Sequence, residues 1–221
     1  AIYPDDFPGI TPKLDVREGD RVMAGTPLMH DKEYPQIALA SPVGGVVKEV
    51  LRGSRRKIIR VVVTPSAEGT PERQGTSDAA IAPKTREDAV EALCRSGLWA
   101  WMRQLPYDIV PRPDAVPRDI FVTGFDSAPL ATDFKQCGID GSNLQAAVDY
   151  LSKLTDGNIY VSFRRGDSLP SIDGITRVEI PCPHPSGNAG VMANNLAPVT
   201  QGDNVGPLPV VPLDRLRPRV A

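Results

Sequence analysis

The chain has 221 residues, a formal net charge of −2 and 41% hydrophobic residues. Its length allows one large domain or two small ones, and we expect two. The nearly balanced charge argues against nucleic acid as a partner, and the best apolar run, residues 58–63, is interrupted by Arg60 and too short to span a bilayer. We therefore expect a soluble, cytoplasmic chain.

The three cysteines are far apart and never in C-x-x-C spacing: Cys94, Cys137 and Cys182. Their odd number favours a reducing compartment over a disulfide framework. The usual four-cysteine iron–sulfur motif is excluded. Cys94 stands on an apolar helix face, so we interpret it as a buried thiol.

Residues 16–47 contain short β-branched segments, each closed by glycine. Gly19, Gly25, Gly44 and Gly45 are expected to take the positive φ angles of tight turns. The pattern predicts a compact sandwich of short strands. It is similar to the biotinyl/lipoyl-like barrel-sandwich hybrid, which we assign to residues 1–66.

A carrier domain of that fold needs a lysine at an exposed hairpin tip. The equivalent position, eight residues before Pro42, is Tyr34. Lys32 lies two positions away, and Pro35 stiffens the tip. We favour a structural or docking module without a covalent carrier lysine, and keep a lipoyl/biotinyl-like carrier or protein-interaction module as the alternative.

Basic side chains crowd residues 52–60: Arg52, Arg55, Arg56, Lys57 and Arg60. The cluster could meet an acidic partner, an anionic headgroup or a phosphate, but a solvated hairpin rim is the simpler interpretation. Residues 67–84 are rich in Pro, Gly, Ser and Glu and read as a linker.

Residues 85–200 predict a Rossmann-like α/β domain. Thr85 and Asp88 form a capping box before an apolar helical pattern, and a second capping box begins at Ser142. Strands are expected at 119–125, 159–163 and 177–180. The first strand delivers polar residues to its carboxyl end, where open α/β sheets bind ligands: Asp126, Ser127 and Asp133.

The sequence offers few catalytic groups. Gly124 is a single glycine where the dinucleotide fingerprint needs three. His184 and Cys182 could chelate a soft metal, but we favour a Gly-x-x-Gly turn with close chain approach and His184 hydrogen-bonding across it. We expect His30 to be a surface residue, and residues 201–221 to form an extended tail without regular structure.

Several short motifs occur together in one order along the chain: residues 16–22, 31–35, 41–45, 52–56, 96–99, 126–131, 154–157 and 183–190. In this order they resemble the A subunit of bacterial sodium-translocating NADH:quinone oxidoreductase. The family continues past Gly190 into a third domain and begins with a strand that is absent here, so we expect a fragment that lacks the C-terminal domain.

The resemblance implies a peripheral subunit on the cytoplasmic face of the bacterial inner membrane, in a complex that passes electrons from NADH to ubiquinone and exports sodium. It implies no tightly bound cofactor on this chain, with FMN, FAD and 2Fe–2S centres on other subunits and ubiquinone as a possible ligand. The implied partners are the other subunits, especially the membrane B subunit, so membrane association would be indirect. An independent NADH-using enzyme is a further alternative.

Two stretches associated with the quinone in that family fall here on residues 3–10 and 101–108. The resemblance implies that these residues lie near the quinone: Tyr3, Phe7, Gly9, Trp101, Arg103, Pro106 and Tyr107. Trp101, Arg103 and Tyr107 would offer flat rings and a hydrogen-bond donor, whereas the simpler alternative is packing at a helix end.

Overall fold

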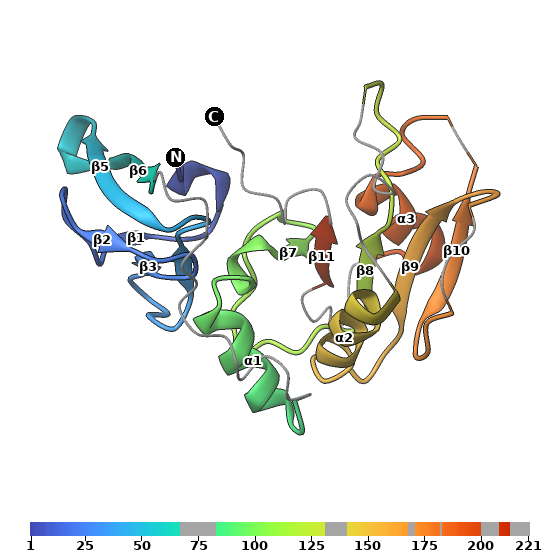
Figure 1. The fold of residues 1–221 in the computed structure, drawn as a ribbon. Helices are drawn as coiled ribbons and strands as arrows, with labels where there is room; N and C mark the ends of the chain where they lie inside the picture. Colours follow the sequence, from blue (N-terminus) through green and yellow to red (C-terminus); the bar gives the residue numbers. More distant parts are fainter. Residues whose placement is uncertain (67–82, 131–140, 168–170, 182, 200–207, 213–221) are drawn as a thin grey trace. The chain divides into compact units, whose positions relative to one another are not determined.

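The computed structural model describes residues 1–66, 83–130, 141–167, 171–181, 183–199 and 208–212. The chain forms two compact units (Figure 1). Among the described residues, 1–66 and 90–101 belong to unit 1, and 83–89 and those from 102 onward belong to unit 2.

Unit 1 contains two three-stranded antiparallel sheets of short strands, as predicted. The first has the order β1-β3-β4: β1 (Pro12–Leu14), β3 (Pro27–Asp31) and β4 (Ala38–Ala40). The second has the order β2-β5-β6: β2 (Arg21–Val22), β5 (Gly45–Arg52) and β6 (Ile58–Pro65). Alternate apolar side chains of these strands fill the core, including Leu28, Leu39, Val47 and Val61.

The turn glycines of unit 1 act in two ways. Gly19 and Gly25 have φ angles of 91° and 92°, as predicted. Gly44 and Gly45 do not have positive φ, so that prediction is wrong for both. Gly45 lies in β5, where a Cβ would collide with the Thr64 carbonyl oxygen of β6. Close contact between strands, rather than a turn, requires this glycine.

The predicted capping box at the start of α1 (Arg86–Arg95) is confirmed. The Asp88 amide donates to Thr85 Oγ1 at 3.1 Å, and the Thr85 amide donates to Asp88 Oδ2 at 3.0 Å. After α1, Gly97 turns the chain with φ 76° toward the 3₁₀ helix η4 (Trp99–Trp101). Apolar residues of this segment, Leu93, Cys94 and Trp99, are buried, which confirms the predicted burial of Cys94.

Unit 2 is built on one five-stranded sheet of order β10-β9-β8-β11-β7. Its strands are β7 (Arg103–Leu105), β8 (Ile120–Thr123), β9 (Ile159–Arg164), β10 (Thr176–Ile180) and β11 (Leu208–Pro212). The first four strands of that order are parallel, and β7 is antiparallel to β11. The three strands predicted at 119–125, 159–163 and 177–180 are confirmed as β8, β9 and β10.

The strand β11 corrects the prediction that residues 201–221 form a tail without regular structure. Leu208–Pro212 pairs with β8 on one side and with β7 on the other. Prolines lack a backbone N–H and normally mark an edge strand or no strand, so Pro209 and Pro212 argued against a position between two neighbours. The strand β11 pairs with its two neighbours through the backbone groups other than the missing N–H groups of its prolines.

Two helices complete unit 2: α2 (Gly141–Leu151) and α3 (Ala189–Leu196). Ser142 lies inside α2, and the Gln145 side chain bonds to Asp149 and Asp173, so the second predicted capping box is wrong. None of the described helices is long and apolar enough to cross a membrane.

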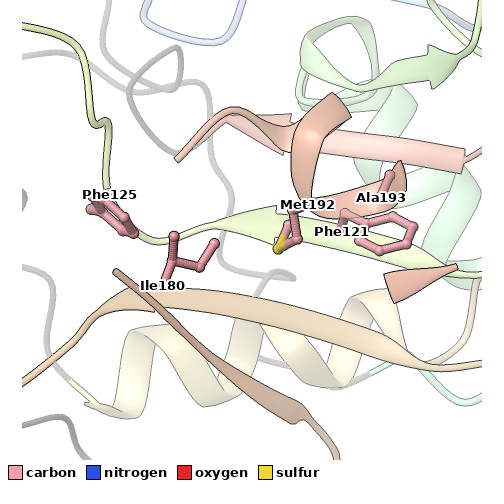
Figure 2. Packing of buried hydrophobic residues seen from close by; sticks show 5 residues of the cluster. All are labelled: Phe121, Phe125, Ile180, Met192 and Ala193. Atoms are coloured by element: carbon pink, nitrogen blue, oxygen red, sulfur yellow. The ribbon is translucent and has the colours of Figure 1, made fainter. Parts of the chain in front are cut away.

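One apolar cluster fixes α3 against the sheet (Figure 2). Figure 2 shows its five residues, which come from β8, the loop after β8, the end of β10 and α3: Phe121, Phe125, Ile180, Met192 and Ala193. The Phe121 ring stacks on Tyr160 of β9, with centroids 5.0 Å apart. Because α3 follows β10 and packs on β8, the loop between β10 and α3 is brought to the carboxyl ends of the parallel strands.

Candidate functional site

An aromatic contact within unit 1 joins Phe7 and Trp101, which come from the two stretches that the family resemblance marked. Phe7 follows the 3₁₀ helix η1 (Pro4–Asp6), and its ring centroid lies 5.0 Å from that of Trp101 at an interplanar angle of 77°. This edge-to-face geometry is a favourable arrangement of two rings. Phe7 is buried and Trp101 is partly buried. Gly9 then turns the chain at φ 92°.

Tyr3 lies on the exposed side of this region, with 40% of its surface accessible. Its hydroxyl hydrogen-bonds Arg60 of β6, and this bond is the largest cause that raises the pKa of the Arg60 guanidinium. Glu49 of β5 adds a second bond, at 3.1 Å from Arg60 Nη2. Tyr3 is therefore anchored to the β5–β6 hairpin.

The remaining predicted quinone-proximal residues belong to unit 2. Arg103 is 2% exposed; its Nη1 donates to the Met102 carbonyl at 3.0 Å, and its Nε lies 3.9 Å from Asp108 Oδ1. A turn follows, closed by the Gln104 amide donating to the Ile109 carbonyl at 2.7 Å. Pro106 and Tyr107 lie on that turn, and Tyr107 is 73% exposed. The Arg103 guanidinium is enclosed by protein, whereas the Tyr107 ring is open to a ligand or partner.

A second polar site lies at the carboxyl ends of the parallel strands. Ser127 Oγ, in the loop after β8, is 3.2 Å from His184 Nδ1 and accepts a hydrogen bond from the Gly187 amide at 2.9 Å. A Cβ on Gly187 would come within 2.8 Å of the Ser127 nitrogen, so only glycine allows this approach. The predicted close chain approach is confirmed, but His184 bonds to Ser127 of another loop rather than across its own turn.

The partner of His184 is the residue that sequence reasoning missed. Ser127 was expected in a ligand loop, but nothing in the sequence linked it to a residue 57 positions away. Asp126 is used locally, because its Oδ1 accepts the Ala128 amide at 2.8 Å. Asp133, also expected in this loop, lies outside the described residues.

This arrangement holds two loops together and already uses the groups that could bind an anion. The Gly187 amide, which could face a phosphate at such a sheet edge, donates to Ser127 instead. Within the described ranges, no group of three or more His, Cys, Asp or Glu side chains could hold a metal. Cys182, the suggested second ligand beside His184, lies outside those ranges.

The hairpin tip where a carrier lysine would stand is firmly tied. Asp31 is 4% exposed and its carboxylate accepts the amides of Thr11 and Tyr34, at 2.7 and 3.0 Å. The Lys32 amide donates to the Thr11 carbonyl at 2.9 Å, while its side chain is exposed. The neighbouring His30 pairs with Asp15 at 2.6 Å.

The Leu-Thr-Asp-Gly motif of residues 154–157 has a structural role. Thr155 Oγ1 donates to the Pro117 carbonyl at 2.8 Å and accepts the Gly157 amide at 3.0 Å. A Cβ on Gly157 would collide with the Arg118 carbonyl oxygen. The motif therefore joins the segments that lead into β8 and β9.

Comparison with known proteins matches both parts of the chain to family models. Residues 1–66 match the NqrA N-terminal barrel-sandwich hybrid domain, and residues 84–209 match the NqrA second alpha/beta domain. The first match supports the barrel-sandwich hybrid prediction, and the second supports an α/β domain after it.

Curated relatives are named as the A subunit of the Na(+)-translocating NADH-quinone reductase. The protein of Saccharophagus degradans is 35% identical over 93% of this chain and 46% of its own length. The protein of Rhodopirellula baltica is 32% identical over 93% of this chain and 46% of its own length. The protein of Hahella chejuensis is 35% identical over 90% of this chain and 45% of its own length. The chain spans about half the length of these relatives. With two family models in sequence order over most of its residues, the chain belongs to the NqrA family.

Proposed function

We propose that this chain acts within a sodium-translocating NADH:quinone reductase, as the part of NqrA that docks on the membrane B subunit and lies near the quinone. The complex as a whole would pass electrons from NADH to ubiquinone and export sodium. The chain would sit on the cytoplasmic face of the membrane, attached through its partners. It would bind ubiquinone at most weakly and leave FMN, FAD and 2Fe–2S to other subunits.

The observation that carries this proposal is the contact between Phe7 and Trp101. The two segments implied to lie near the quinone are separated by most of unit 1 in sequence, yet their aromatic rings touch at 5.0 Å. A quinone head is a flat ring that stacks on aromatic side chains. Within the same unit, Tyr3 adds an exposed phenol at 40% accessibility, which could donate to a quinone carbonyl.

Our proposal also assigns unit 2 a Rossmann-like arrangement in which the nucleotide site has been lost. In the parallel order β10-β9-β8-β11, the strands β9 and β10 are added on one side of β8, and β11 is added on its other side. Such a reversal of strand order is typical of doubly wound sheets. The Ser127–Gly187 bond occupies the sheet edge where such folds bind phosphate. This supports a docking role for the unit rather than NADH binding.

A photoreactive ubiquinone analogue, crosslinked to the assembled complex and mapped by mass spectrometry, tests the quinone assignment. We expect labelled peptides from residues 3–10 or 101–108, and less label when Trp101 is replaced by Leu. Lys153→Ala, an exposed change in unit 2, is the control and should keep the label. Labels confined to other subunits would refute the quinone role. Failure of the chain to co-purify with the membrane subunits would refute the docking role.

A further inference from the structure

The β5–β6 hairpin ends in a rigid apex of arginines. The apex is the 3₁₀ turn η2 (Ser54–Arg56), closed by the Gly53 amide donating to the Lys57 carbonyl at 2.8 Å. Arg52 Nη1 donates to the Arg56 carbonyl at 3.0 Å and ties the base of the turn. These two bonds fix the backbone of the turn and the position of the Arg52 side chain.

Two of these arginines have a costly backbone conformation. Arg55 and Arg56 have φ angles of 54° and 62°, in the left-handed region that side chains with a Cβ seldom adopt. Glycine or asparagine would fit this turn with less strain. Arginine at both positions therefore indicates a use for the side chains beyond forming the turn.

Two basic residues near the hairpin apex are paired with carboxylates, but the arginines of the apex itself are not. Lys57 pairs with Asp5 at 2.8 Å, and Arg60 pairs with Glu49 at 3.1 Å. Among the described residues no carboxylate lies within ion-pair distance of the exposed side chains Arg52, Arg55 and Arg56, which we call the arginine tip. On a chain of net charge −2, the arginine tip is a local concentration of positive charge.

The chemistry of the arginine tip favours protein carboxylates over a lipid surface. Segments that hold anionic lipid carry roughly 4–8 basic residues, usually beside an apolar anchor. The tip has fewer free cations, and Ile59, 37% exposed, is the only exposed large apolar residue of the hairpin's β6 strand. The planar guanidinium fork of arginine instead matches the bidentate geometry of Asp and Glu side chains.

We propose that the arginine tip is a docking surface for a carboxylate-rich face of a partner protein. The tip stands at the apex of a hairpin whose backbone is set by hydrogen bonds, and its positive charge is complementary to an acidic face of that partner. This inference goes beyond the proposed function, since the aromatic contact between Phe7 and Trp101 does not involve the tip. Its test uses this chain alone, so the result does not depend on assembly of a complex.

The experiment compares binding of poly-L-glutamate and of phosphatidylcholine vesicles containing phosphatidylglycerol, measured by calorimetry at low and high salt. The test variant is Arg55→Gly with Arg56→Gly, which removes two charges and relieves the left-handed backbone at both positions. The control is Arg17→Ala with Arg21→Ala, which removes the same charge from exposed positions. Arg21 pairs with Val46, so it lies about 20 Å from Arg52 along β5.

We expect the unmodified chain to bind poly-L-glutamate more tightly than the vesicles, with an affinity that falls as salt rises. The glycine variant should lose about tenfold in affinity while its melting temperature stays equal or rises, and the control should keep its affinity. Equal losses in both variants would overturn the proposal, because any reduction in positive charge would then explain them. Tighter binding to vesicles, or no binding to poly-L-glutamate, would also overturn it.

Discussion

Gly45 and Gly19 of unit 1 are required for different physical reasons. A Cβ on Gly45 would collide with the Thr64 carbonyl, and that backbone atom cannot rotate away as a side chain could. Gly19 has open space around it but a φ angle of 91°. The first glycine is required by interstrand contact and the second by its dihedral angle.

We therefore expect Gly45→Ala to destabilise the chain more than Gly19→Ala. The first change should cost about 3 kcal/mol, at the upper end of overpacking effects. The second should cost about 1–2 kcal/mol, the penalty of a left-handed alanine. Urea denaturation followed by circular dichroism measures both, and equal losses would contradict the distinction.

The Cys94 thiol is buried, and burial raises its pKa to about 12. A thiolate is the reactive form, so a higher pKa leaves less of it at neutral pH. Against the ordinary value of 9.0, the thiolate fraction at pH 8 falls about a thousandfold.

Alkylation of Cys94 by iodoacetamide should accordingly be at least about a thousandfold slower in the native chain than in urea at pH 8. The native rate should keep rising about tenfold per pH unit up to pH 10. Peptide-resolved mass spectrometry distinguishes Cys94 from the other cysteines. Rapid labelling of the native chain at pH 8 would show that the thiol is accessible and ionised.

At the scale of elements, the start of α1 depends on a reciprocal pair. Hydrogen bonds from the Thr85 amide, and also from Lys84, lower the pKa of Asp88. A carboxyl group whose pKa is lower in the folded state contributes stability above its unfolded pKa. That contribution is lost as pH falls through the folded value.

Thr85→Ala should cost about 1 kcal/mol in the free energy of unfolding at pH 7, as for other N-cap losses. Asp88→Asn should also destabilise the chain at pH 7, because the asparagine side chain lacks the negative charge that the backbone amides of Lys84 and Thr85 stabilise. The difference between Asp88→Asn and the parent should shrink as pH falls below about 4. A difference that is independent of pH would show that the carboxylate charge does not matter.

How much of these elements the sequence could reveal depended on the range of the interaction. The Thr85 box and the strands at 120–123 and 159–164 rest on neighbours within a few residues, so their patterns were readable. The second capping box failed because Gln145 finds Asp173, a partner remote in sequence. The same holds for the candidate site, where Ser127 meets His184 only through the completed sheet.

The β11 strand could not be predicted for a related reason. Its prolines indicate irregular chain locally, and only pairing with β8 and β7, both remote in sequence, gives its backbone groups partners. For Gly45, the sequence indicated that a glycine is needed within the β-rich segment, but not why. The cause is the Thr64 carbonyl of the neighbouring strand, which a Cβ would meet. Phe7 and Trp101 were linked by family resemblance, and geometry then supplied the contact.

At the scale of the whole molecule, the two units differ in the surfaces they offer to ligands and partners. Unit 1 offers the aromatic contact and the arginine tip, and unit 2 offers a sheet edge closed by Ser127 and Gly187. A dinucleotide would have to displace that hydrogen bond and find further amides.

We expect calorimetric titration of the chain with NADH to give no binding heat up to millimolar ligand, because the Gly187 amide is already engaged. Ser127→Gly removes the acceptor and frees that amide, so it is the informative comparison. A saturable heat with the unmodified chain would contradict our assignment of unit 2 as a docking unit.

The position of β11 has a consequence for how the chain is made. β8 leaves the ribosome long before Leu208–Pro212 is synthesised. During translation, the edge of β8 that later pairs with β11 therefore has no partner strand. Until then β7 has no strand to pair with on that side, and the nascent sheet presents open backbone groups that could join a wrong chain. Shortening the gene before the codon for Leu208 should therefore yield a product that depends on chaperones, even though every described helix and the four earlier strands of the sheet are encoded.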